Sequence, residues 1–397
     1  MRVLYVEMAF GFGGSLTGLL HLFKYLPRDV EPMLVTGFDA RPFAEIPHGL
    51  LYEVAEIPTN PTESGGALRQ LLGFYRSNAK PWMKHLDNTI RNFRPDVIHT
   101  ANSVFSNAPA ALTGLRHKIP TVGYQKGFEW RGLPNRYVLR RGWFRHHIAS
   151  SSSVAERLFE LGLPRERCTV MYEPVEPPPV ESSVNERDPE LPVVAMYSVL
   201  QPWKGQEIFL QAIAKVNARY DKPFRVLIAG SAPKGFEDYP DRLQVLATDL
   251  GIANKVQFSG HVRDIFQLLA ATDIAVHASV EPEPFGRVIA EAMISGVAVV
   301  ATKAGGAAEI VQHEETGLHV PMGDAEAMAQ AIQRLLSDLQ LRRSLGLRAR
   351  EFALREFRPT LHAQKVVELY HHVLGNQPKR ASPGQSSSSS RPSRLLG

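Results

Sequence analysis

Short apolar runs alternate with amphipathic stretches along most of this chain, and this alternation constrains its fold more than any other feature. Short apolar runs are typical of strands buried on both faces, while the amphipathic stretches have the spacing of helices. Strands that alternate with helices form parallel sheets with helices on both faces. We expect strands at Val3–Val6, Met33–Thr36, Val97–His99, Pro120–Gly123, Ile148–Ser151, Val193–Tyr197, Arg225–Ala229, Lys255–Phe258, Asp273–His277 and Ala298–Thr302.

A cluster of prolines divides this pattern into two halves. Glu173–Pro179 contains four prolines in seven residues, and a polar stretch follows as far as Pro192. Because proline can continue neither a helix nor a central strand, we expect an interdomain linker at 179–192, between α/β domains at 1–178 and 193–360. Ligands of such sheets bind beyond the carboxyl ends of the strands, so a cleft between the domains is the natural site.

Helical patterns fill the spaces between the strands. After about Ala325 the pattern stays helical to Leu374 and is broken only around Phe357–Pro359. Residues 376–397 include five consecutive serines and are predicted to form a disordered tail that the chemistry does not need. The other helices are expected at Leu16–Tyr25, Leu68–Ser77, Met83–Phe93, Gln206–Tyr220 and Phe266–Ala271.

The positive charge of the chain is unevenly distributed. The net charge of +5 divides into +5 for residues 1–178, −4 for 179–375 and +4 for the tail. No nucleic-acid-binding module accompanies this charge, so we expect no nucleic-acid partner. The single cysteine, Cys168, excludes an intramolecular disulfide and a Cys-based zinc cluster, and its apolar neighbours predict a buried strand position. Without a long apolar run or a signal peptide, a cytoplasmic protein is expected.

Two acidic residues follow the strand predicted at Asp273–His277. Pro284 suits the first turn of a helix, which would leave the N–H groups of Phe285 and Gly286 free at its positive end. Glu283 and Glu291 would then hold two ends of an elongated ligand. The plainer alternative is one capping acid and one solvated helical acid.

These residues carry a resemblance to a known family. Glu283, seven intervening residues and Glu291 resemble the E-x7-E element of the retaining GT-B glycosyltransferases of group 1, or family 4. The resemblance covers roughly residues 1–375 and is more specific in the second half. Other segments similar to that family, in its order, are Gly11–Ser15, Gln201–Gln206, Gly296–Thr302, Ala304–Val311 and Thr316–Pro321.

The resemblance implies a fold and a donor site. The fold is GT-B, in which two Rossmann-like parallel-sheet domains face each other across a cleft and a final helix, here 361–375, crosses back to the first domain. Glu283 and the amides of Phe285 and Gly286 would contact the transferred sugar, while Glu291 would bind the ribose hydroxyls. Lys204 supplies a positive charge for the diphosphate of a nucleotide sugar.

Two glycine pairs belong to the same predicted donor site. Gly13 and Gly14 would let the backbone of the first domain approach the diphosphate, although a plain turn explains that loop almost as well. Gly305 and Gly306 would either cradle the diphosphate or end a turn, and the sequence does not decide between these two interpretations.

One position departs from the family pattern. The family usually places an arginine shortly before the lysine, and here Val199 occupies that place. Loss of a phosphate partner would weaken stabilisation of the leaving group unless another cation replaces it. Arg263 and Arg287 are the candidates, and Arg287 is counted among the donor-binding residues.

The acceptor side is less well marked. Many relatives carry a cleft histidine where this chain has Gln125 and Lys126, so these two residues are the expected acceptor contacts. His99 ends a predicted strand and is expected to face the cleft, where a lone histidine has a structural role more often than a catalytic one.

A basic segment at Arg131–His147 has five arginines, interleaved aromatic residues and no acid. It is interpreted in three ways, as a solvated face, as a patch that contacts the anionic inner face of a membrane, or as a site for an anionic acceptor. Liposome binding before and after charge reversal at Arg140 and Arg141 separates these interpretations.

The predicted activity follows from the resemblance. We expect a retaining, metal-independent transferase that moves a sugar from a nucleoside-diphosphate sugar to a glycan, lipid-linked or small-molecule acceptor, with no cofactor beyond that co-substrate. The catalytic candidates are Glu283 and Lys204. Two alternatives remain, a non-catalytic nucleotide-binding protein, suggested by Val199, and a sugar-nucleotide epimerase of the same fold.

Overall fold

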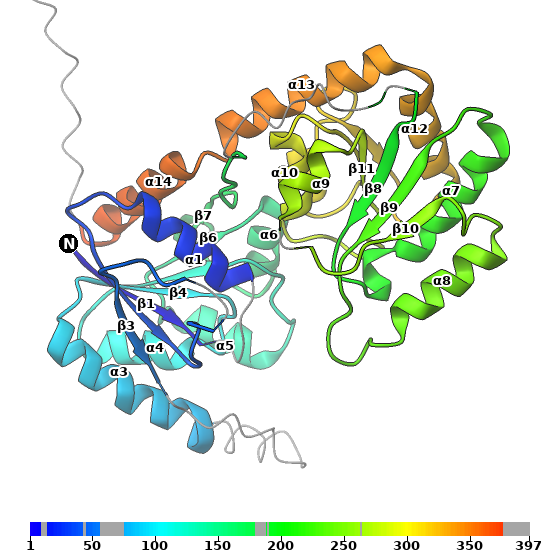
Figure 1. The fold of residues 1–397 in the computed structure, drawn as a ribbon. Coiled ribbons are helices and arrows are strands. Elements are labelled where there is room, and N and C mark those ends of the chain that lie inside the picture. The colour runs from blue at the N-terminus through cyan, green and yellow to red at the C-terminus, as the bar shows by residue number, and fades with distance from the viewer. Residues whose placement is uncertain are drawn as a thin grey trace, which may run out of the picture.

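The computed structural model describes residues 1–8, 14–42, 45–55, 75–178, 188, 190–262 and 264–375. They form two parallel sheets, each in its own domain (Figure 1). The first sheet has the order β3-β2-β1-β4-β5-β6-β7 and the second has the order β10-β9-β8-β11-β12-β13. The strands are β1 Arg2–Glu7, β2 Glu31–Thr36, β3 Leu51–Val54, β4 Val97–Ala101, β5 Thr121–Gln125, β6 His146–Ala149, β7 Cys168–Val170, β8 Val193–Tyr197, β9 Arg225–Ala229, β10 Val256–Phe258, β11 Ile274–His277, β12 Ala298–Thr302 and β13 Leu318–Val320.

The two sheets share one connectivity. In each, the chain moves outward from the first strand, returns, and continues on the other side, so the order reverses between β1 and β4 and between β8 and β11. This is the doubly wound arrangement that binds ligands beyond the strand ends at the reversal point. The predicted α/β class and two-domain architecture are confirmed.

Most strands lie where the apolar runs predict them, although β4 and β5 each continue two residues beyond their predicted ends. The prediction for β6 was wrong by two residues, because its first residue is His146 and Ser150 already follows the strand. The edge strands β3 and β13 were missed, since neither is a continuous apolar run. Cys168 begins the edge strand β7 and is half-buried, and burial raises the pKa of its thiol to about 12.

Most helices connect successive strands, and α12, α13 and α14 follow the last strand, β13. Of the helix expected at Leu68–Ser77, only the end lies within the described residues, as the π-helical turn η1 Tyr75–Ala79. The long C-terminal helical region has a break that was not predicted, at Asp338, whose carboxylate accepts the N–H of Leu341. The helices are α1 Gly14–Tyr25, α3 Lys80–Phe93, α4 Ala108–Arg116, α5 Leu133–Arg141, α6 Ser152–Glu160, η2 Arg165–Arg167, η4 Pro202–Lys204, α7 Gln206–Arg219, α8 Tyr239–Asp249, α9 Ile265–Ala270, α10 Arg287–Ile294, α11 Ala307–Ile310, α12 Ala325–Ser337, α13 Leu339–Glu356 and α14 Pro359–Val373.

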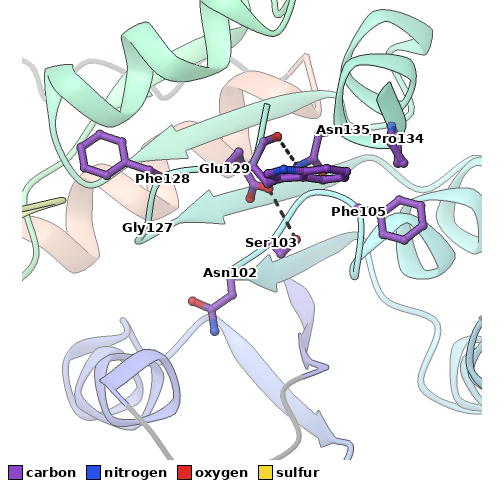
Figure 2. Close-up of a pocket in the computed structure, with 9 residues that line it drawn as sticks. Asn102, Ser103, Phe105, Gly127, Phe128, Glu129, Pro134 and Asn135 are labelled. Carbon is purple, nitrogen blue, oxygen red and sulfur yellow. Dashed lines mark hydrogen bonds between the residues drawn. The ribbon is translucent and has the colours of Figure 1, made fainter. Parts of the chain in front are cut away.

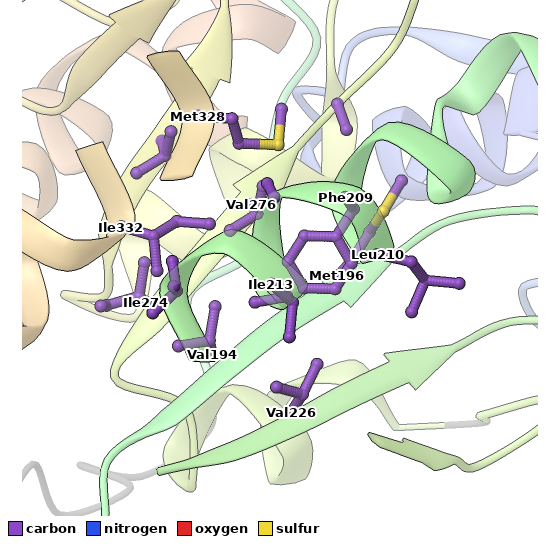
Figure 3. Close-up of a cluster of buried hydrophobic side chains, with 14 of the residues drawn as sticks. Val194, Met196, Phe209, Leu210, Ile213, Val226, Ile274, Val276, Met328 and Ile332 are labelled. Atoms are coloured by element: carbon purple, nitrogen blue, oxygen red, sulfur yellow. The ribbon is translucent and has the colours of Figure 1, made fainter. Parts of the chain in front are cut away.

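The second domain has a core on each face of its sheet. On one face, side chains of β8, β9 and β11 pack against α7 and α12, as Figure 3 shows for Phe209, Ile213 and Ile332. On the other face, the buried residues of α10 and α13 cover β12. Burial of both faces explains why these strands are apolar throughout.

The last helix belongs to the core of the first domain. α13 runs along the second domain, and α14 then packs beside α1 (Figure 1). The buried face of α14 includes Val366 and Tyr370, which join the cluster around Val3 and Leu19. Within the described residues, the chain passes between the domains at 171–178 and again at Phe357. Most of the linker predicted at 179–192 lies outside the described residues.

Candidate functional site

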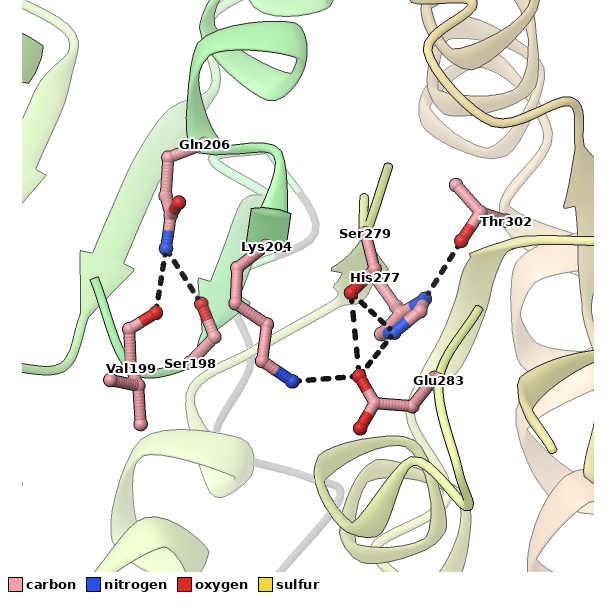
Figure 4. A network of polar contacts seen from close by, with 8 residues as sticks. All are labelled: Ser198, Val199, Lys204, Gln206, His277, Ser279, Glu283 and Thr302. Atoms are coloured by element: carbon pink, nitrogen blue, oxygen red, sulfur yellow. Dashed lines mark hydrogen bonds and ion pairs between the residues drawn. The ribbon is translucent and has the colours of Figure 1, made fainter. Parts of the chain in front are cut away.

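The second domain gathers a compact polar cluster at its reversal point. Lys204 Nζ lies 2.7 Å from Glu283 Oε2, and the same oxygen lies 3.2 Å from His277 Nε2 (Figure 4). Lys204 follows β8, and His277 is the last residue of β11, the neighbouring strand. The sequence prediction paired Lys204 with Glu283 in one site, and the structure brings these two side chains into direct contact.

Two hydroxyl groups complete this cluster. Ser279 Oγ lies 3.0 Å from His277 Nε2 and 3.3 Å from Glu283 Oε2. Thr302 Oγ1, at the end of β12, lies 3.1 Å from His277 Nδ1. Both ring nitrogens of His277 are therefore hydrogen-bonded, which fixes the ring beside Glu283. Sequence reasoning missed these three residues, although their positions at the ends of neighbouring strands are a usable signal.

The cluster is nearly enclosed by protein. The side chains of Lys204 and Glu283 are only 13% and 12% exposed. Burial raises the pKa of Glu283, but the hydrogen bond with His277 and the charge of Lys204 outweigh it and hold this pKa at about 2. Glu283 is therefore a carboxylate at neutral pH, paired with a cation that can also meet an anionic ligand.

A tight turn brings Lys204 to this position. The 3-10 turn η4 ends at Gly205, whose φ is 77°, and a Cβ built there would lie 2.0 Å from the carbonyl oxygen of Ala278. Only glycine therefore allows the η4–α7 turn to approach β11 closely. Gln206 supports the turn from the other side, because its Nε2 donates to Val199 O at 2.9 Å.

The predicted start of the helix after Glu283 was wrong by three residues. α10 begins at Arg287, with Gly286 as its N-cap at φ 97°, so Pro284 precedes the helix instead of opening it. The backbone of Glu283 bridges to Gly305, and its carbonyl accepts the N–H of Gly306 at 2.6 Å. This pairing holds the segment extended until Gly286 turns it into the helix.

The contacts of Gly305 and Gly306 support the structural interpretation of this pair. A Cβ at Gly305 would lie 2.2 Å from Glu283 O, and one at Gly306 would lie 2.4 Å from Pro284 O. The Gly306 N–H already donates to the Glu283 carbonyl, so in this arrangement it cannot also donate to a diphosphate. The pair instead sets the position of the Glu283 backbone.

The N–H groups of Phe285 and Gly286 have no described acceptor among residues 1–8, 14–42, 45–55, 75–178, 188, 190–262 and 264–375. They lie just ahead of α10, and their role in binding a ligand stays a prediction. The Phe285 side chain is buried beside Tyr172 and Phe357, at ring-centre distances of 6.1 and 5.7 Å.

A second charged network connects the two domains. Arg287 Nε lies 3.0 Å from Glu291 Oε1, one helical turn away, and its guanidinium also approaches Glu173 Oε2 at 4.0 Å. Glu173 in turn lies 3.7 Å from Lys126 Nζ, which follows β5 in the first domain. Burial raises the pKa of Glu291, partly offset by Arg287. Predicted donor and acceptor residues thus meet at the junction.

His99 does not face a cleft, so its expected role in acceptor binding is corrected. It is fully buried, and its Nδ1 lies 2.8 Å from the hydroxyl of Tyr370 on α14. Burial lowers the pKa of His99 to about 3, so the ring is neutral. The returning helix α14 covers this part of the sheet and makes His99 a core residue.

Gln125 is also corrected from an acceptor contact to a structural residue. Its side chain is buried, and Nε2 donates to Asn102 O at 2.9 Å while Oε1 lies 2.9 Å from His147 Nδ1. Both ends of the amide are therefore used inside the domain. Of the three predicted acceptor residues, Lys126 alone lies at the interdomain junction.

The remaining predicted residues fall at or outside the limits of the described chain. Gly14 is the first residue of α1, while Gly13 and Arg263 lie outside the described residues. Val199 is 44% exposed beside the Lys204 turn. Within the described ranges, no three His, Cys, Asp or Glu side chains gather closely enough to hold a metal ion.

The first domain has a cavity of about 410 Å³ beyond the ends of β4 and β5. Phe105, Phe128 and Trp130 line it, together with the carboxylate of Glu129 (Figure 2). Burial raises the pKa of Glu129, which accepts the N–H of Val104 at 2.8 Å. Asn135 Oδ1 in the same wall is buried and has no partner among the described residues.

Comparisons with known proteins agree with this architecture. A family profile described as "Glycosyltransferase Family 4" matches residues 12–177, and one described as "Glycosyl transferases group 1" matches 179–352. Among named relatives, the chain is similar to the lipopolysaccharide core biosynthesis glycosyltransferase LpsE of Rhizobium meliloti, with 29% identity over 61% of this chain and 68% of that protein. It is also similar to a GDP-mannose-dependent phosphatidylinositol monomannoside mannosyltransferase of Mycobacterium tuberculosis, with 30% identity over 66% and 73% of the two chains.

Solved structures share the whole architecture. The Anabaena protein HepE, crystallised with UDP, aligns with a TM-score of 0.77 and 26% identity over 94% of this chain and all of that one. A glycosyltransferase from Rickettsia africae has the same fold, with a TM-score of 0.80 and 22% identity over 95% and 99%. The matching profiles, the relatives and the fold together show that the chain belongs to the group 1, or family 4, glycosyltransferases and has the GT-B fold.

Proposed function

We propose that the chain transfers a hexose from a nucleoside-diphosphate sugar to an acceptor with retention at the anomeric carbon and without a metal ion. The observation that carries this proposal is the enclosed cluster of Lys204, Glu283 and His277 at the reversal point of the second sheet. Lys204 would turn from Glu283 toward the diphosphate and stabilise the leaving group. Glu283 and the amides of Phe285 and Gly286 would orient the sugar, and Glu291 would accept the ribose hydroxyls.

A retaining transfer of this kind does not require the protein to form a covalent bond with the sugar. The leaving phosphate and the acceptor hydroxyl lie on the same face of the sugar, and the phosphate oxygen can accept the proton of the attacking hydroxyl. The residues would orient the two substrates, exclude water and balance the developing charge. Arg287 would take the part of the arginine that Val199 replaces, and its partners Glu291 and Glu173 hold it at the junction.

The test is a screen of UDP-, GDP- and ADP-sugars for transfer, with the anomeric configuration of the product read by NMR and activity compared with and without EDTA. UDP and GDP come first, because HepE was crystallised with UDP and the mycobacterial relative depends on GDP-mannose. We expect Glu283→Ala to abolish transfer and Glu291→Ala mainly to weaken donor binding. Glu281→Ala is the matched control, since Glu281 is an exposed acid in the same loop.

The outcomes separate the alternatives. Nucleotide binding without hydrolysis or transfer would favour a non-catalytic protein, and an epimerised nucleotide sugar released without acceptor would favour an epimerase. Unchanged turnover in both glutamate variants would contradict the assigned residues. An inverted product would contradict retention alone.

We propose that the cavity beside Glu129 binds the acceptor and that the acceptor is a glycan. Aromatic rings suit the C–H faces of sugars, and the free Asn135 Oδ1 and the Glu129 carboxylate are acceptors for hydroxyl donors. Trp130 rests on Gly132, where a Cβ would lie 2.0 Å from the indole ring. Glu129→Gln and Trp130→Ala should each raise the acceptor KM several-fold without changing donor affinity, whereas Phe236→Ala, a partly exposed aromatic control in the second domain, should leave the acceptor KM unchanged.

We also propose that the segment 131–147 contacts an anionic membrane. Leu133 and Tyr137 on α5 are 80% and 52% exposed, and neighbouring Trp130 is 71% exposed. Arginines beside exposed apolar side chains suit anionic headgroups. Sedimentation with phosphatidylglycerol vesicles should fall after charge reversal at Arg140 and Arg141, and equal sedimentation of both proteins would remove the proposal. Among the described residues, no helix is long and apolar enough to cross a membrane.

A further inference from the structure

Glu309, in the second domain, forms a contact with the first domain that has no role in the proposed reaction. Its carboxylate accepts three hydrogen bonds, each of 2.7 Å, from Ser152 N, Ser153 N and Ser153 Oγ. These donors form the N-terminus of α6, a helix of the first domain. The contact therefore joins residues more than 150 positions apart in the chain, without passing through the linker.

The donor geometry shows that α6 is completed by the other domain. The Ser151 side chain accepts the N–H of Val154 at 3.2 Å, and its carbonyl accepts the N–H of Ala155. The two preceding amides, of Ser152 and Ser153, are bonded to Glu309. The first four N–H groups of a helix have no partners within the helix, and a carboxylate at that end is also favoured by the helix dipole.

Glu309 is also connected, within its own domain, to the polar cluster of Lys204, Glu283 and His277. It lies on α11, whose N-cap is Gly306, and Glu309 N donates to Gly306 O at 3.0 Å. Gly306 N donates to the carbonyl of Glu283 at 2.6 Å. The same short segment therefore contacts the first domain at one end and positions the backbone of Glu283 at the other.

We propose that Glu309 is a positioning residue that acts as an interdomain latch. Docking of its carboxylate on the N-terminus of α6 would favour the arrangement in which the two domains are in contact, and it would hold α11 and the Glu283 backbone in place only in that arrangement. When the domains separate, the carboxylate and the two amides pass to water, so the latch is reversible. The effect on turnover rests on the proposed transferase function, whereas the effect on domain arrangement does not.

The first test compares Glu309→Gln with Glu315→Gln. Glu315 is an exposed acid six residues further along, and the hydrogen bonds described for it are made by its backbone. Small-angle X-ray scattering should give a larger radius of gyration for Glu309→Gln alone. If transfer is detected, its kcat/KM should fall roughly 10-fold, the range expected for a charged hydrogen-bonded contact, with an unchanged melting temperature of the second domain.

The second test places a repelling charge on the other side of the contact. Ser153→Asp should separate the domains, because two carboxylates would then face each other, while an acid in the first turn favours α6 itself. In a double-mutant cycle the Ser153→Asp effect should be smaller in the Glu309→Gln background. Ser106→Asp, a half-buried serine in the loop after β4, is the control substitution.

The outcomes are decisive in either case. Equal scattering for Glu309→Gln and Glu315→Gln, or additive effects in the cycle, would overturn the latch even if turnover falls, because Glu309 would then act only inside its own domain. If no nucleotide sugar supports transfer, the proposed function fails, and the scattering and the cycle measured by scattering still decide on the latch.

Discussion

Each domain contains a buried lysine–glutamate pair next to a strand end, and the two pairs are built differently. Lys204 and Glu283 lie 2.7 Å apart inside one domain, with His277 bonded to the same carboxylate. Lys126 and Glu173 lie 3.7 Å apart, and Glu173 comes from the connecting segment, where Arg287 of the other domain also approaches it. The first pair is set by the fold of a single domain, whereas the second depends on how the domains are arranged.

The difference fits the proposal that the same topology serves two tasks. The second domain concentrates fixed charges at its reversal point, as a diphosphate donor requires. The first domain has neutral, buried hydrogen-bonding residues at the corresponding edge, such as His99 and Gln125, and keeps its cavity to one side at Glu129. Substitutions in the two pairs should therefore change different steps of the reaction.

The largest effect is expected at Lys204. Lys204→Ala removes the charge proposed to meet the leaving diphosphate, so kcat should fall by roughly 100- to 1,000-fold. Steady-state kinetics with a saturating acceptor measure this. Lys234→Ala, an exposed lysine of the same domain, should behave as the unaltered chain. A loss of less than about 5-fold at Lys204 would show that the two pairs do not differ in chemistry.

A smaller effect is expected at Lys126. Lys126→Ala leaves the buried carboxylate of Glu173 with Arg287 as its described cationic neighbour, which should loosen the junction and lower kcat/KM for the acceptor by roughly 10-fold. Donor affinity, measured by calorimetry with UDP or GDP, should stay within about 2-fold. If donor affinity falls as much as in Lys204→Ala, then the second pair also belongs to the donor site.

Two buried histidines, one in each domain, provide a further comparison between the domains. His277 is bonded to Glu283, and His99 is bonded to Tyr370. His99→Phe should lower the free energy of unfolding by about 1–3 kcal/mol, because the Tyr370 hydroxyl loses a partner, and leave the acceptor KM unchanged. His277→Phe should instead lower kcat. Urea unfolding and kinetics on both variants provide the measurement, and a raised acceptor KM in His99→Phe would restore the original interpretation of that residue.

The smallest effect is a difference in pH dependence. The pKa of Glu283 is held at about 2, below its ordinary 4.5, so its contribution to stability is present above pH 4.5 and is lost as the pH falls toward 2. The pKa of Glu129 is raised by burial, so its ionisation opposes folding; this penalty begins to fall when the pH drops through the raised value and is gone below the ordinary pKa of 4.5. As the pH falls, the free energy of unfolding of the unaltered chain should decrease relative to that of Glu283→Gln. It should increase relative to that of Glu129→Gln. Urea unfolding between pH 7 and about 3 tests this, and equal slopes would contradict it.

Much of the fold, and the grouping of Lys204 with Glu283, could be predicted from the sequence. Apolar runs identify central strands reliably because both of their faces are buried. Lys204 and Glu283 were assigned to one site from the resemblance to the family, and the structure places them in contact. The motif did not show where α10 starts, because the bridge between Glu283 and Gly305 is a long-range backbone contact.

The errors at His99 and Gln125 have a common physical cause. The space that a ligand was expected to occupy is filled by other parts of the chain, by α14 at His99 and by Asn102 and His147 at Gln125. β4 also continues past His99 to Ala101, and the sequence near His99 carries no sign of a helix some 270 positions later. Glu309 was missed for the same reason. Its partners are backbone N–H groups of another domain, which no residue pattern reveals.

The return of α14 to the first domain also has a consequence for how the protein is made. The hydroxyls of Tyr5 and Tyr370 lie 3.1 Å apart although 365 positions separate them, and the apolar face of α1 is covered by α14. During synthesis the first domain cannot complete its core until α14 has left the ribosome, whereas the second domain can begin to fold before that point. The domain made first should therefore be finished last, with α1 in need of protection from aggregation in the meantime.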